Sequence, residues 1–136
     1  MKKQTLLLGL SLLLIATVAY ARDLNLKANI PFDFVVNGAT LPSGEYSLQG
    51  LAVGNAISIR KADQTAKALA LGIRCESRET SEKSKLVFHR YGNRYFLAQI
   101  WMAGDNAGEE LPKTRLETEI AQSRTAEEVV LVAALR

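Results

Sequence analysis

The sequence predicts a mainly β protein: an antiparallel β-sandwich or small barrel of about seven strands with one helix near the C-terminus. Three observations lead to this prediction. Apolar residues alternate along residues 24–36, tight-turn pairs occur at Asn37-Gly38 and Gly92-Asn93, and a helical spacing occurs close to the C-terminus. The chain has 136 residues, 48% of them hydrophobic, so it is too short for two ordinary domains and too apolar for a disordered chain.

Residues 1–21 predict a secretory signal peptide. Lys2 and Lys3 precede an apolar run, and Ala19-Tyr20-Ala21 is an A-x-A cleavage pattern. The apolar run has about 15 residues, whereas a spanning helix needs roughly 20. An uncleaved membrane anchor is the alternative. No second long apolar run follows, so we expect export to the periplasm or the extracellular space, no stable membrane span after cleavage, and one β-rich domain over residues 22–136.

The net charge of the mature chain gives no indication of nucleic-acid binding. The whole chain carries +3, but cleavage removes Lys2 and Lys3, which leaves 15 Lys and Arg against 14 Asp and Glu, a net charge of +1. Positive and negative residues are interspersed, whereas a nucleic-acid site needs a concentrated basic face. We therefore expect no nucleic-acid partner.

The first half of the mature chain predicts a series of strands. The alternation over residues 24–36 indicates a strand with one face in the core, and Pro31 places it at an edge or splits it. Asn37-Gly38 predicts a hairpin turn and residues 42–44 a second turn, after which the alternation resumes over residues 45–51.

The middle of the chain predicts two further strands. Residues 56–61 form a short strand with Ile57 and Ile59 inward, and Asp63-Gln64 turns the chain. Over residues 67–75 the expected inward set is Leu69, Leu71, Ile73 and Cys75. The alanines in that stretch also allow a helix. Residues 76–85 are almost wholly polar and indicate an exposed loop.

Gly92-Asn93 predicts a two-residue type II′ hairpin turn between strands over residues 86–91 and 94–102. This register pairs Arg90 with Tyr95 and gives the hairpin two largely apolar faces. We expect one face to hold Leu86, Phe88, Arg90, Tyr95, Leu97 and Trp101, and the other to hold Val87, His89, Tyr91, Phe96, Ala98 and Ile100. The hairpin therefore belongs in the middle of the fold, with the Arg90 guanidinium over the Tyr95 ring.

The C-terminal part predicts an acidic turn over residues 105–110, then a helix from Pro112 to about Ser123. Glu109 and Glu110 would favour the dipole of this helix, and Leu116 and Ile120 would form its narrow apolar stripe. Residues 129–132 are β-branched or apolar and predict a closing strand, with a last helical turn as the alternative.

The sequence lacks the usual parts of an active site, so we expect no enzyme, no metal and no cofactor. His89 is the only histidine, and its position in a strand beside Val87 and Tyr91 is typical of a packed sheet residue. A hydrolase using His89 is an alternative. Cys75 and His89 are too few for a zinc site. Cys75 is expected to be a buried thiol, with intermolecular pairing or a reactive thiol beside Arg74 as alternatives.

Five aromatic residues lie within 14 positions and form the candidate ligand or partner surface: Phe88, Tyr91, Tyr95, Phe96 and Trp101. Such a cluster can line a ligand cavity or a protein interface. In a small β domain, aromatic residues more often form the core.

Four segments resemble a group of short, signal-bearing bacterial proteins of unknown function. They are residues 29–38 (NIPFDFVVNG), 41–46 (LPSGEY), 85–101 (KLVFHRYGNRYFLAQIW) and 110–115 (ELPKTR). The resemblance implies export and one shared domain, and it implies no activity or site.

These observations together predict an exported, non-catalytic module that binds a partner protein or a cell-envelope component. The alternative is a carrier of a small apolar ligand, held in the cavity of a barrel.

Overall fold

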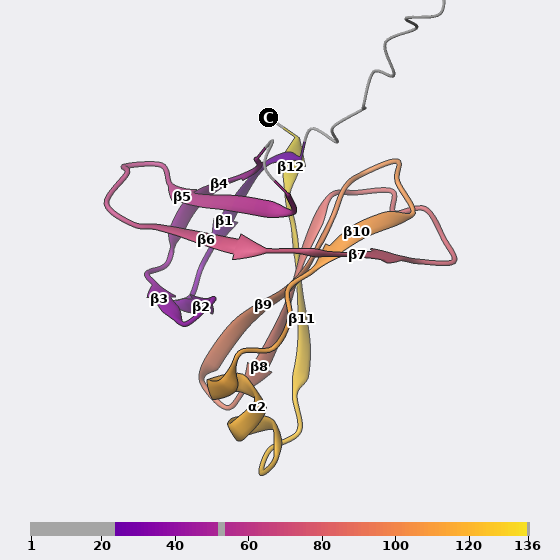
Figure 1. The fold of residues 1–136 in the computed structure, drawn as a ribbon. Helices are drawn as coiled ribbons and strands as arrows, with labels where there is room; N and C mark the ends of the chain where they lie inside the picture. The colour runs from indigo at the N-terminus through magenta and orange to yellow at the C-terminus, as the bar shows by residue number, and fades with distance from the viewer. Residues whose placement is uncertain (1–23, 52–53, 136) are drawn as a thin grey trace, which may run out of the picture.

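The computed structural model describes residues 24–51 and 54–135, and the predicted signal peptide lies outside them. The described chain forms two β-sheets with one helix near the C-terminus, a β-sandwich, as Figure 1 shows. The first sheet has the spatial order β12 (Ala134–Leu135), β1 (Asn25–Ile30), β4 (Gly44–Gly50), β5 (Ala56–Lys61) and β6 (Lys67–Leu71). The second has the order β11 (Glu127–Val132), β8 (Lys85–Tyr91), β9 (Arg94–Trp101), β10 (Ala107–Glu110) and β7 (Ile73–Glu76).

The mainly β fold with a C-terminal helix is confirmed, with more strands than the predicted seven because several are short. β2 (Phe34–Val36) and β3 (Ala39–Leu41) form a hairpin attached to the second sheet, where β2 pairs with β9. Pro31 does split the first alternating stretch, since β1 ends at Ile30 and β2 begins at Phe34. Asn37 and Gly38 have φ values of 48° and 81°, as a type I′ turn requires.

The core lies between the two sheets and is centred on aromatic residues. Phe34 packs edge-on against Tyr46 and Phe88, with ring centroids 5.0 and 5.7 Å apart. The inward positions of β1 alternate as predicted, with Leu26, Ala28 and Ile30 buried. The apolar contacts between the sheets are the main favourable term in such a fold.

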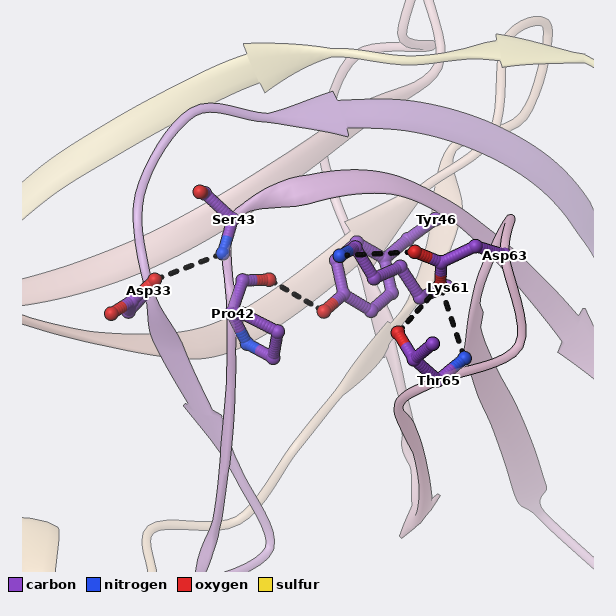
Figure 2. A network of polar contacts seen from close by, with 7 residues as sticks. All are labelled: Asp33, Pro42, Ser43, Tyr46, Lys61, Asp63 and Thr65. Atoms are coloured by element: carbon purple, nitrogen blue, oxygen red, sulfur yellow. Dashed lines mark hydrogen bonds and ion pairs between the residues drawn. The ribbon is translucent and has the colours of Figure 1, made fainter.

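Polar contacts fix two turns of the first sheet (Figure 2). The Ser43 amide donates to Asp33 over 2.9 Å, and the buried Tyr46 hydroxyl donates to the Pro42 carbonyl. In the turn between β5 and β6, Asp63 accepts from the Thr65 hydroxyl and amide and lies 3.4 Å from Lys61 Nζ. The hydrogen bonds from Thr65, more than the charge of Lys61, lower the pKa of Asp63.

Two segments pass from one sheet to the other. β6 continues into β7 through Gly72, and β11 continues into β12 through Ala133. Gly72 is buried, and a Cβ atom there would lie 2.6 Å from Glu109 Oε2. A larger residue at the crossing between β6 and β7 would therefore have to displace the Glu109 side chain.

The predicted inward set of residues 67–75 is wrong. Leu69, Leu71 and Ile73 are 59%, 68% and 57% exposed, whereas Ala70 is buried in the core. The alternation itself is present, but the small residues face inward. Ala68 and Ala70 pair with the large core residues Ile59 and Ile57 of β5, which fill the space on that side.

The hairpin of β8 and β9 follows the predicted register from Tyr91–Arg94 to Phe88–Leu97, with Gly92 at φ +64°. A β-bulge between Val87 and Phe88 then shifts the pairing, so that Val87 pairs with Gln99. Ile100 therefore joins the core, and Trp101 lies on the opposite face, which reverses the predicted faces of these two residues.

The C-terminal elements differ from the prediction in two ways. The acidic stretch is partly a strand, because β10 pairs with both β7 and β9, so Glu109 and Glu110 do not begin the helix. Helix α2 (Arg115–Ala121) is shorter than expected and has Thr114 as its N-cap. Leu116 is exposed, and α2 packs on the sheet through Glu117, Ile120 and Ala121.

The predicted closing strand is confirmed as β11, and residues 77–84 form the predicted polar loop. Within the described residues, α2 is the one helix, and it is neither long nor apolar enough to span a bilayer.

Candidate functional site

The five aromatic residues of the candidate surface are distributed over three environments. Phe88 lies in the main core, and Tyr95 stacks on Phe32 with ring centroids 3.7 Å apart. Tyr91 and Phe96 form a smaller core beneath α2. Trp101 is nearly buried on the outer face of the second sheet, where its indole N–H donates to Gln99. A ligand-binding role for these five aromatic residues stays a prediction.

The predicted cation–π contact is present at the edge of this group. The Arg90 guanidinium carbon lies 5.5 Å from the centre of the Tyr95 ring. Arg90 also donates to the Gly92 carbonyl over 2.7 Å and lies 3.8 Å from Glu127 of β11. Through these contacts, Arg90 stabilises the hairpin turn.

His89 belongs to a buried polar network that the sequence did not indicate. Glu117 of α2 is only 4% exposed, and one of its carboxylate oxygens accepts from His89 Nδ1 over 3.0 Å and from the Tyr91 hydroxyl over 2.9 Å. Burial, and then the hydrogen bond to Glu117, raise the pKa of Tyr91 to about 12. The network ties α2 to β8, and Glu117 is the one side-chain partner of His89 among the described residues.

Glu117 is a charged position outside the apolar stripe of Leu116 and Ile120 that the sequence predicts for this helix. The spacing of Thr114 and Glu117 is that of a helix capping box, which marks the start of the helix but not the direction of the glutamate. Its partners lie 26 and 28 positions earlier in the chain, so only the folded structure reveals them. A hydrolase role for His89 stays a prediction.

Cys75 is a partly buried free thiol on β7. Burial raises its pKa, and the nearby carboxylates of Glu110 and Glu109 act in the same direction. The thiol form is therefore favoured over the nucleophilic thiolate.

A cavity of about 270 Å³ opens between the two sheets, near the end of β1 that begins with Asn25. Its lining includes Leu24, Ile57 and Ile100 together with Arg74 and Glu109. One carboxylate oxygen of Glu109 is buried there with no hydrogen-bond partner. Ligand pockets are usually about 300–1,000 Å³, so this cavity is small for the carrier hypothesis, which stays a prediction.

A larger feature lies along β6. Two hollows, of about 250 and 450 Å³, border this strand and share Asn37 in their lining. We call them together the β6 groove. Its lining comes from β2, β3 and the turn between them, from β5, β6 and β9, from the segment between β10 and α2, and from α2 itself. The lining residues are Val35, Val36, Asn37, Ala39, Ser58, Arg60, Lys67, Ala68, Leu69, Ala70, Leu71, Phe96, Leu97, Leu111, Pro112, Lys113, Thr114 and Glu117.

The groove runs along the unpaired edge of β6, beside the β2–β3 hairpin. β6 is the last strand of the first sheet, and β3 pairs only with β2. The β2–β3 hairpin lies beside β6 (Figure 1), and no backbone ladder joins them. One side chain bridges the gap: Asn37 Nδ2 donates to the Leu69 carbonyl over 3.2 Å. The Asn37 amide thus takes the place that a backbone N–H of an added strand would take.

Scans against protein-family models, curated proteins and solved structures found no match to the chain. The resemblance to short exported bacterial proteins therefore stays a prediction.

Proposed function

We propose that the protein is an exported, non-catalytic module that binds a partner polypeptide by receiving one of its extended segments in the β6 groove. Recognition by strand addition uses backbone hydrogen bonds for affinity and side-chain pockets for specificity. An edge strand with unpaired backbone groups and a neighbouring hollow supplies both elements. The predicted signal peptide supports the export part of this proposal.

The observation that carries the proposal is the outward position of Leu69 and Leu71. Proteins usually protect edge strands with charged residues, proline or a covering element. Here two large apolar side chains project from the edge strand while the core side holds alanines. Burial of a leucine side chain is favourable by roughly 1.5–3 kcal/mol, so a partner that covers both gains substantial binding energy.

A peptide-display selection against the mature protein tests the proposal. We expect enrichment of extended peptides that bind wild type and do not bind a Leu69→Thr, Leu71→Thr double variant. Val132→Thr is the matched control, because Val132 is 64% exposed on β11, the edge strand of the other sheet. Peptides that bind all three proteins equally would place the binding site elsewhere.

A further inference from the structure

We infer that the segment received by the β6 groove is acidic as well as apolar, with a carboxylate held between Arg60 and Lys67. This inference rests on the proposed function and specifies the chemistry of the partner.

Arg60 and Lys67 form a like-charge pair across two strands. They are directly opposite each other in the register of β5 and β6, and both line the larger hollow of the groove. Like charges at directly opposite positions destabilise a sheet. The Arg60–Lys67 pair is therefore unfavourable for the stability of the sheet. Unfavourable local features of this kind concentrate at functional sites.

Arg60 and Lys67 have no counter-charge within the described part of the chain. Among the residues that the structure describes, no acidic side chain lies within 4.0 Å of Arg60 or Lys67, and none lines the larger hollow. On the other side of Arg60, its neighbour in β4 is the uncharged Ser47. Two neighbouring lysines are different. Lys61, next to Arg60 in the sequence, is paired with Asp63, and Lys27 of β1, opposite Ser47, is paired with Glu45.

Charge and apolar surface therefore alternate along the groove. Lys67 is followed on the same face of β6 by Leu69 and Leu71, and Lys113 lines the smaller hollow at the far end. An extended segment has side chains at every second position on one face, so a carboxylate followed by two apolar residues matches this order. A guanidinium and an ammonium group beside one carboxylate form charge-assisted hydrogen bonds.

A set of three eight-residue peptides tests the inference. Each alternates Val and Thr and carries Glu, Gln or Lys at one position on the valine face. Fluorescence titration of the mature protein should give the Glu peptide a dissociation constant about threefold to tenfold lower than that of the Gln peptide. The difference should shrink in 1 M salt, and the Lys peptide should bind most weakly.

Lys67→Glu provides an independent readout, because it converts the like-charge pair into an ion pair with Arg60. This variant should unfold at a higher temperature than wild type and lose the preference for the Glu peptide. Lys83→Glu, an exposed change in the polar loop, is the control and should keep that preference.

The possible outcomes separate the two proposals. Equal binding of the Glu and Gln peptides, with loss of binding in the Leu69→Thr, Leu71→Thr variant, would overturn the acidic partner and keep the proposed function. Absence of binding by every peptide would overturn both. Concentration-dependent self-association that Lys67→Glu abolishes would identify the occupant as β11 of a second copy, which presents Glu128, Val130 and Val132, and would also overturn the inference.

Discussion

Glu117 shows how a single residue can hold an element in place. Its carboxylate is buried beneath α2 and accepts two hydrogen bonds from β8, from His89 and Tyr91. Hydrogen bonds to a charged group contribute about 1.5–3 kcal/mol. Glu117→Gln should therefore lower the free energy of unfolding by roughly 1–3 kcal/mol, measured by urea denaturation. Glu119→Gln, an exposed change on the same helix, should have an effect below about 0.5 kcal/mol, and equal effects would contradict the role of the network.

The same network predicts a pH dependence at the residue scale. The Tyr91 phenol has a pKa of about 12 when folded against 10.0 when unfolded, so its ionisation favours the unfolded chain. Its contribution to stability is complete below pH 10 and is lost as the pH rises towards 12. A Tyr91→Phe variant should lose less stability than wild type between pH 10 and 12 in urea denaturation. Parallel pH profiles for the two proteins would contradict this assignment.

Gly72 lies where a larger residue would press on two side chains, those of Glu109 and Ile57. An added Cβ would lie 2.6 Å from Glu109 Oε2 and 3.1 Å from Ile57 Cδ1. Overpacking of this kind costs about 1–3 kcal/mol, so Gly72→Ala should lower the thermal midpoint. A Gly72→Ala, Glu109→Ala double variant should recover part of the loss, because it removes the nearer contact. A Gly72→Ala protein as stable as wild type would mean that the crossing has more room than the structure shows.

At the scale of elements, the tip of the β2–β3 hairpin covers part of the edge of β6. Asn37 caps the Leu69 carbonyl, and Asn37→Gly would remove the cap while keeping a turn sequence that suits a type I′ hairpin. This variant should bind a groove peptide about twofold to tenfold more tightly than wild type. The reason is that the Asn37 side chain no longer competes with a peptide N–H for the Leu69 carbonyl. Weaker binding in a titration would show that Asn37 contacts the peptide instead of competing with it.

The elements also show which features a sequence can predict. The first alternating stretch and the hairpin turns were correct, because one buried face and positive-φ residues leave direct patterns in the chain. The bulge between Val87 and Phe88 has no such pattern, so the predicted faces of Ile100 and Trp101 are wrong. The predicted buried face of residues 67–75 is wrong because large apolar side chains normally mark the core face of a strand, whereas at this edge they face solvent. That failure coincides with the proposed binding site.

At the scale of the whole molecule, folding and binding make different demands on β6. Leu69 and Leu71 contribute little to the core, whereas Ala68 and Ala70 face it. The free energy of unfolding of the Leu69→Thr, Leu71→Thr variant, measured by urea denaturation, should therefore lie within about 0.5 kcal/mol of the wild-type value, as is usual for surface substitutions. A loss above roughly 1.5 kcal/mol would indicate that the two leucines serve the fold and not a partner.

The most direct test of the central claim is amide hydrogen exchange of the mature protein with and without a saturating amount of the Glu peptide. Strand addition at the edge of β6 predicts slower exchange at amides of β6, with β11 unchanged. Protection confined to β11 or α2, with β6 exchanging as in the free protein, would contradict the account.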